Sequence, residues 1–144
     1  GAKSKRLQLV LKLFQKQEDQ VAQMLSKLKS QLQQEQQKLE QLYSYQTQYH
    51  QQFEQKAIAG INSRDFITQQ QFLQQLQQVT QSQQKGLNEQ AQYMTTVQEK
   101  WMSLYLKRKN FEKLIKKIQK NEQIQLDKQE QKLIDELVSQ IRLQ

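Results

Sequence analysis

Hydrophobic residues recur with a seven-residue period from Leu7 to Phe53, and no proline interrupts them. Eleven of the fourteen positions on this heptad seam are apolar, namely Leu7, Leu11, Phe14, Val21, Leu25, Leu28, Leu32, Leu39, Leu42, Tyr49 and Phe53, while Glu18, Glu35 and Gln46 are polar. A repeat of this length predicts a long helix that packs against another helix. Because a rod of this kind has no concave interior, we expect the function to lie in surface contacts.

The composition argues against a large globular core. Glutamine supplies 36 of the 144 residues, and only 35% of the residues are hydrophobic. Glutamine is a good helix former, and the apolar residues are periodic, so a helix is favoured over a disordered, prion-like segment. The absence of cysteine excludes a disulfide framework and thiolate metal sites. No apolar run exceeds three residues, so we expect no direct membrane insertion.

The helical pattern breaks at one place, between Ala57 and Ser63. Gly60 suits the left-handed residue that closes a helix, and Asn62 can cap the next one with Asp65 three residues further on. Ile61 and Phe66 have the spacing of a hydrophobic staple. We therefore expect helices over about 4–58 and 63–140, joined by a turn at about 59–62, in a single coiled-coil domain over 1–144.

The second helix carries its own heptads. Eleven of its sixteen seam positions are apolar; the a positions are Phe66, Leu73, Thr80, Leu87, Met94, Trp101, Arg108 and Ile115, and the d positions are Gln69, Leu76, Gln83, Gln90, Val97, Leu104, Phe111 and Ile118. Folding about Ile61 pairs residues whose numbers add to about 122, and this register brings a positions opposite d positions. The predicted fold class is all-α, a long antiparallel two-helix coiled-coil hairpin.

Residues beyond Ile118 overhang the start of the first helix. Their apolar positions, Leu126, Leu133, Leu137 and Ile141, form a weaker stripe out of phase with Ile118. This pattern predicts a frayed or partner-stabilised helical end.

The sequence offers little raw material for catalysis. His50 is the only histidine, and no glycine-rich phosphate loop is present. Paired acids such as Glu18-Asp19 and Asp135-Glu136 are more typical of solvated helix faces than of an acid and base pair. We therefore expect a protein that is not an enzyme and that has no cofactor and no metal.

An aromatic and aliphatic strip follows one side of the seam near the turn. We call Leu42, Tyr45, Tyr49, Phe72, Leu76 and Val79 the aromatic strip. Exposed aromatic anchors dominate the energetics of protein interfaces, so the strip is a candidate partner site. The alternatives are that a wide core or a self-association seam uses the same residues.

Basic residues are concentrated at the open end of the predicted hairpin, opposite the turn. Between Lys100 and Lys120 there are eight basic residues and one acid, and Lys3, Lys5, Arg6 and Lys12 fold opposite them. Nucleic acid and an anionic membrane are weak candidates, because stacking aromatics and an exposed apolar face are missing from the pattern. A solvated helix surface and docking on an acidic protein surface remain as the two main interpretations.

Several runs of the sequence match a known family in order and spacing. They are Leu39-Glu-Gln-Leu42-Tyr-Ser-Tyr45-Gln46-Thr-Gln-Tyr49, then Gly60-Ile61, then Gln71-Phe72-Leu73-Gln-Gln-Leu76, with Trp101, Lys107-Arg108-Lys109 and Gln131-Lys132-Leu-Ile-Asp135-Glu136 further on. In these runs the chain resembles the FliJ family of the bacterial flagellar type III export apparatus.

The resemblance implies a cytoplasmic, non-enzymatic coiled coil similar to the central stalk of rotary ATPases, peripheral at the flagellar base. It implies that the open end enters the export ATPase hexamer, promotes its assembly and links it to the export gate, through Lys5, Arg6, Lys107, Arg108, Lys109, Lys113, Lys116 and Lys117, which we call the basic open end. It also implies that the aromatic strip binds the cytoplasmic domain of the export gate, that export chaperones are escorted, and that nucleic acid is not a partner. The alternative is a generic coiled-coil scaffold or a self-associating helical bundle.

Overall fold

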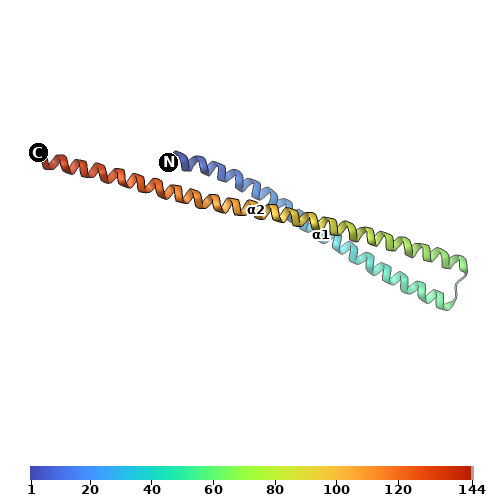
Figure 1. Ribbon diagram of the computed structural model, residues 1–144. Coiled ribbons are helices and arrows are strands. Elements are labelled where there is room, and N and C mark those ends of the chain that lie inside the picture. Colours follow the sequence, from blue (N-terminus) through green and yellow to red (C-terminus); the bar gives the residue numbers. More distant parts are fainter. Residues whose placement is uncertain (144) are drawn as a thin grey trace. The chain divides into compact units, whose positions relative to one another are not determined.

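The chain folds into two long helices that form a hairpin. A computed structural model describes residues 1–143, and in it α1 spans Ala2–Ala59 and α2 spans Ser63–Leu143 (Figure 1). Only Gly60, Ile61 and Asn62 lie between the two helices. The predicted all-α fold class is confirmed, with the turn inside the predicted range.

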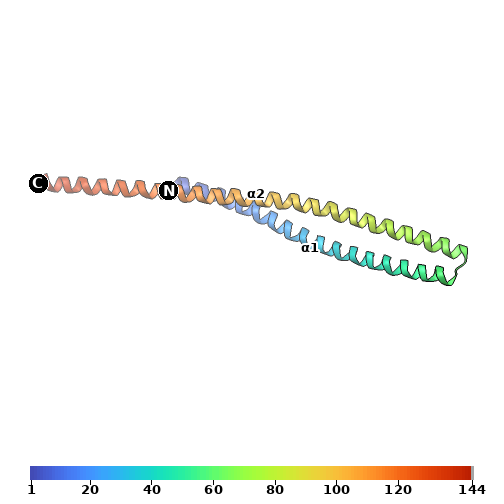
Figure 2. The ribbon, with the colours of Figure 1, turned by 60° about the horizontal axis from the view of Figure 1, so that its bottom comes forward.

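The hairpin divides into two units, which are described separately. The turn-proximal unit comprises Gln23–Glu99, and the terminal unit comprises Gly1–Ala22 together with the chain from Lys100 onward. In each unit a stretch of α1 runs antiparallel to a stretch of α2, and the two views in Figures 1 and 2 agree that these stretches lie side by side. Each unit therefore contains its own section of the helix–helix seam.

The turn has the local chemistry that the sequence predicts. Gly60 has a φ angle of 100°, which L side chains rarely adopt, and its N–H donates to the Lys56 carbonyl at 3.0 Å. The Asn62 side-chain oxygen accepts from the Asp65 N–H at 2.8 Å, and the Asn62 amide donates to the Asp65 carboxylate at 3.1 Å. The hydrogen bond of the Gly60 N–H closes α1, and the bond from the Asp65 N–H to Asn62 caps α2. Both give a partner to backbone groups that have none within the helix.

The core of each unit is the predicted seam. All fourteen seam positions of α1 are buried or half-buried, as are fourteen of the sixteen in α2, the exceptions being Phe66 and Gln90. The most deeply buried apolar side chains are Leu39, Leu76, Leu87, Val97 and Ile115. Near Gln90 the neighbouring Ala91 is half-buried instead, so the contact line shifts by one residue where the heptad position is polar.

Aromatic contacts confirm the antiparallel register to within about one helical turn. The rings of Phe53 and Phe66 lie 5.2 Å apart in the turn-proximal unit, and those of Phe14 and Phe111 lie 5.2 Å apart in the terminal unit. Their residue numbers add to values on either side of the predicted 122. Because the heptads of both helices are in phase, a hairpin with so short a turn has little choice of pairing.

The overhang of α2 is helical to Leu143 and extends past the start of α1 (Figure 1). Every residue from Gln123 to Leu143 is exposed. Leu126, Leu133, Leu137 and Ile141 are 58%, 60%, 58% and 70% exposed. The predicted stripe is therefore present on a regular helix, and no other part of the described residues 1–143 covers it.

Candidate protein-binding surfaces

The aromatic strip brings together side chains from both helices of the turn-proximal unit. The Tyr49 ring of α1 lies 4.5 Å from the Phe72 ring of α2, and 6.1 Å from the Tyr45 ring one turn earlier. Tyr45, Phe72 and Val79 are 48%, 37% and 54% exposed, whereas Tyr49 is half-buried. The result is a ridge of tilted aromatic rings, in which Tyr49 lies in the seam and the rings of Tyr45 and Phe72 are exposed to solvent.

Two members of the strip lie deeper than the others. Leu76 is only 8% exposed, because it occupies a d position at the centre of the seam, and Leu42 is half-buried for the same reason. Leu76 therefore offers little surface. The neighbouring Gln46, also a seam residue, has a buried side-chain oxygen without a hydrogen-bond partner among the described residues.

The basic open end is largely a solvent-facing surface of the terminal unit. Lys5 and Arg6 of α1 are exposed, as are five lysines of α2: Lys107, Lys109, Lys113, Lys116 and Lys117. Exposed charges of one sign raise the local potential and steer the approach of an acidic partner. These seven exposed side chains are the ones that an acidic partner could contact.

Arg108 differs from the lysines around it, because its guanidinium lies in the seam. It donates to both carboxylate oxygens of Glu18, at 3.1 Å for the Nη2 contact, and to the Glu112 carboxylate at 2.8 Å. The side chains of Arg108 and Glu18 are only 19% and 10% exposed. Hydrogen bonds to Glu18, and then to Glu112, raise the pKa of Arg108. Its charge is thus paired within the chain, unlike the charges of the exposed lysines around it.

An aromatic cluster beside this ion pair was not singled out from the sequence. The Tyr105 ring stacks on Trp101 at 5.4 Å, and Lys109 Nζ lies 5.3 Å from the centre of the Tyr105 ring. Lys107 Nζ, also of α2, lies 5.0 Å from the centre of the Phe14 ring of α1. The spacing of four residues between Trp101 and Tyr105 was the available signal, because residues at i and i+4 share a helix face. These rings hold two of the lysines close to the helix surface.

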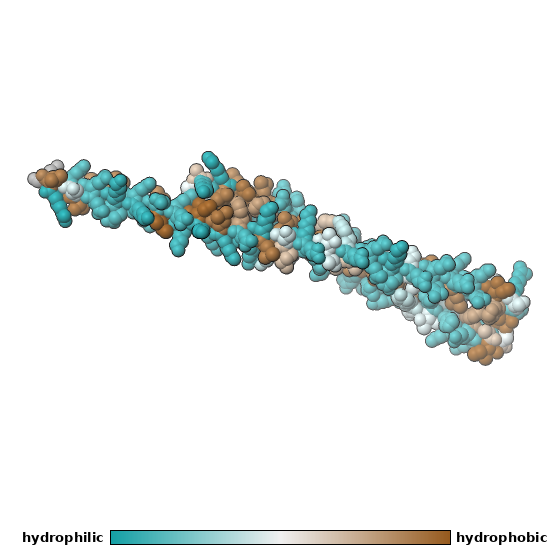
Figure 3. Space-filling view, viewed as in Figure 1, coloured by the Kyte–Doolittle hydropathy of each residue, from teal (hydrophilic) through white to brown (hydrophobic). Residues whose placement is uncertain are grey.

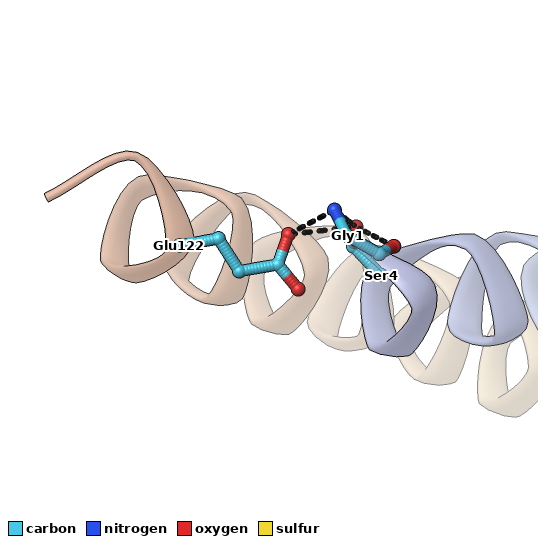
Figure 4. A network of polar contacts seen from close by, with 3 residues as sticks. All are labelled: Gly1, Ser4 and Glu122. Atoms are coloured by element: carbon cyan, nitrogen blue, oxygen red, sulfur yellow. Dashed lines mark hydrogen bonds and ion pairs between the residues drawn. The ribbon is translucent and has the colours of Figure 1, made fainter. Parts of the chain in front are cut away.

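At the start of α1, a small polar network attaches the first residues to α2. The amino group of Gly1 donates to the Glu122 carboxylate at 2.6 Å, and the Ser4 hydroxyl donates to the same oxygen at 3.0 Å (Figure 4). The bond from the amino group is the main reason that the pKa of Glu122 is lowered. This network fixes the point on α2 beyond which the overhang begins.

Other kinds of site find no support in the part of the chain that the structure describes. Within residues 1–143, no group of three or more His, Cys, Asp or Glu side chains is placed to hold a metal ion. Neither helix has a stretch that is long and apolar enough to cross a bilayer, as far as Leu143. On the face shown in Figure 3, hydrophobic residues instead gather in patches among hydrophilic ones along both helices.

The fold and these surfaces define a class: a helical coiled-coil protein that works through contacts with other proteins. Comparison with protein families then gives the family. Residues 3–144 match the family described as Flagellar FliJ protein, which is nearly the whole chain, and the chain belongs to this family. Neither the curated proteins nor the solved structures contain a significant match. Membership implies a structural component of the flagellar export apparatus.

Proposed function

We propose that this protein links the flagellar export ATPase to the export gate without catalysing a reaction itself. The observation that carries the proposal is that the two candidate surfaces differ in chemistry and belong to different units. The aromatic strip lies in the turn-proximal unit, and the exposed lysines lie in the terminal unit. Two chemically distinct surfaces on one chain suit two different partners.

The aromatic strip is the proposed contact with the cytoplasmic domain of the export gate. Tyr45, Phe72 and Val79 offer exposed apolar surface, and Tyr49 holds the ridge in place through its contact with Phe72. Large aromatic side chains with a fixed orientation lose little conformational entropy when they bind. Leu42 and Leu76 lie deeper in the seam and would add little exposed surface to this contact.

The basic open end is the proposed contact with the ATPase ring. Lys107, Lys109, Lys113, Lys116 and Lys117 of α2, with Lys5 and Arg6 of α1, give this surface its charge. Arg108 contributes by fixing the two helices to each other through Glu18. An acidic ring opening would be recognised mainly through the rate of encounter and the register of docking. By family resemblance, the chain also promotes ring assembly, escorts export chaperones, and stays in the cytoplasm at the membrane-proximal base of the flagellum.

Binding of purified variants to each partner tests the proposal. The variant Tyr45→Ala/Tyr49→Ala/Phe72→Ala should lower affinity for the export-gate domain at least about tenfold, because aromatic anchors are typical hot spots. It should keep its affinity for the ATPase. Tyr93→Ala is the matched control, since Tyr93 is 50% exposed in the same unit but lies outside the strip.

The reverse experiment uses charge. Lys109→Glu/Lys113→Glu/Lys117→Glu should weaken ATPase binding, and the effect should shrink as salt is raised. The control reverses three exposed lysines of the other unit, Lys27, Lys29 and Lys85, for the same change in net charge. Equal losses from the two triple variants would show that net charge alone matters, and wild-type affinity in both would remove the proposed ring contact. Far-UV circular dichroism checks that each variant remains helical.

A further inference from the structure

The overhang of α2 has an apolar face that no other part of the described residues 1–143 covers. Leu133, Ile134 and Leu137 are 60%, 46% and 58% exposed on a regular helix that continues to Leu143. They share one side of the helix with Leu126 and with one acid, Glu130, because these positions recur every three or four residues. A continuous exposed stripe of this kind is typical of an interaction site.

The start of α1 carries a second unpartnered stripe, on the side opposite its seam. Leu9, Val10 and Leu13 are 63%, 36% and 61% exposed, although α1 already buries Leu7, Leu11 and Phe14 against α2. Arg6 continues the stripe one turn earlier. The first helix therefore has two apolar faces in this region, of which its own hairpin uses one.

We infer that the overhang of one copy packs on this outer face of α1 in a second copy, so that the chain forms a closed dimer. Charge favours the pairing. Residues 1–17 contain five basic side chains and no acidic one, whereas residues 124–143 contain four acids (Asp127, Glu130, Asp135, Glu136) and three bases. The same difference opposes a pairing of two overhangs or of two α1 helices.

One register satisfies both stripes. With the helices parallel and residue n of α1 opposite residue n + 124 of α2, Glu130 faces Arg6, Leu133 faces Leu9 and Leu137 faces Leu13. The flanking residues Ile134 and Val10 also coincide. A shift of one heptad in either direction places Glu130 opposite Leu13, or Leu137 opposite Arg6. An acid and a base facing each other inside an apolar seam set register, as Glu18 and Arg108 do within this chain.

The parallel direction of the two paired helices follows from the two-fold symmetry of the dimer. α1 and α2 run antiparallel within the terminal unit, so a two-fold axis perpendicular to them inverts the second copy and makes its α2 parallel to α1 of the first. The overhang from Glu122 to Leu143 is about 30 Å long at 1.5 Å per residue, and in this register its last residue, Leu143, lies opposite Asp19 of α1. Each copy then offers one overhang and receives one.

This pairing lies outside the proposed contacts with the export gate and the ATPase. Because it covers Arg6, which we also place in the basic open end, pairing and ring binding would compete for the terminal unit. The dimer would be the resting form of the chain away from the ring. Its test uses the purified chain alone, so that failure of this inference and failure of the proposed function give different results.

Sedimentation equilibrium over a wide concentration range provides the measurement. The wild-type chain should dimerise, and Leu133→Gln/Leu137→Gln should abolish dimers while far-UV helicity of the hairpin is kept. Leu114→Gln/Leu106→Gln is the matched control, since both leucines are exposed on the same helix but outside the stripe. A wild-type chain that stays monomeric, or a dimer that survives the Leu133 and Leu137 changes, would overturn the inference.

Charge exchange tests the register. Glu130→Arg should weaken the dimer about tenfold or more, which corresponds to about 1.4 kcal/mol. Adding Arg6→Glu should restore most of the loss, whereas adding Lys16→Glu should not. Lys16 is the informative comparison because an antiparallel pairing of the same stripes would place it opposite Glu130. Rescue by Lys16→Glu, or by neither change, would contradict the parallel register.

Discussion

Single polar residues interrupt the apolar seam of α1, and two of them have polar partners. Glu18 is buried and binds Arg108 across the helix pair, and Glu35 accepts hydrogen bonds from Gln83 and Lys38. The side-chain oxygen of the third, Gln46, has no hydrogen-bond partner among the described residues. A buried charge without a partner is costly, so such residues specify which stretches of helix meet. The sequence located these positions as breaks in the heptad pattern, but long side chains have too many rotamers for their partners to be read from the pattern alone.

The Glu18–Arg108 pair provides a test at this scale. Arg108→Met should lower the free energy of unfolding by about 1–2 kcal/mol, because it leaves a largely buried carboxylate without its donor. Urea unfolding followed by far-UV circular dichroism gives the value. The double variant Glu18→Leu/Arg108→Leu should regain most of the stability, and Lys109→Met, at an exposed neighbour, should change little. A single Arg108 variant as stable as wild type would mean that the pair contributes nothing to the fold.

The hydrogen bonds that Glu35 accepts predict that the stability of the fold depends on pH. Hydrogen bonds from Gln83, and then from Lys38, lower the pKa of Glu35 below its ordinary value of 4.5. A carboxylate whose pKa is lower in the folded state stabilises the fold above pH 4.5, and this contribution is lost as the pH falls through the folded-state pKa. The melting-temperature difference between wild type and Glu35→Gln should be constant near neutral pH and shrink below pH 4.5. A difference that grows in acid would have the wrong sign.

At the scale of helices, the ends were easier to predict than the surfaces. Gly60, Asn62 and Asp65 act where their chemistry predicts, since capping depends on neighbours in the sequence. The seam could likewise be predicted, because it depends on the regular spacing of apolar residues along the sequence. The exposure of the aromatic strip was harder to predict: the heptad pattern places Leu76 in the seam, but it does not give the exposed fraction of the flanking Phe72, which depends on how α2 is rotated against α1.

The two internal glycines should respond in opposite directions to the same substitution. Gly60→Ala places a side chain at a φ of 100° and should destabilise the hairpin by about 1 kcal/mol. Gly86→Ala lies in the middle of α2, where an added Cβ meets no atom within 4 Å, and should stabilise it by about 0.5–1 kcal/mol. Thermal unfolding of both variants shows whether each substitution stabilises or destabilises the hairpin. Destabilisation by Gly86→Ala would contradict this expectation and would indicate that helix packing near Gly86 depends on the flexibility of the glycine.

At the scale of the whole molecule, the hairpin separates an aromatic surface from a basic one by placing them in different units. Family membership follows from nearly the whole chain, and it agrees with the resemblance carried by the Leu39–Tyr49 and Gln71–Leu76 runs. The overhang was the least predictable part, because its stripe is out of phase with the seam and none of the other described residues covers it. A pattern identifies an interacting face without identifying what covers it.

The most direct test of the central claim asks whether one chain joins the two partners. The export-gate domain would be passed over immobilised export ATPase with and without this protein, and the retained gate domain would be measured. We expect retention only when the wild-type chain is present, and loss of retention with either the Tyr45/Tyr49/Phe72 variant or the Lys109/Lys113/Lys117 variant. If the chain bound each partner separately but never retained the gate domain on the ATPase, the linking function would be contradicted.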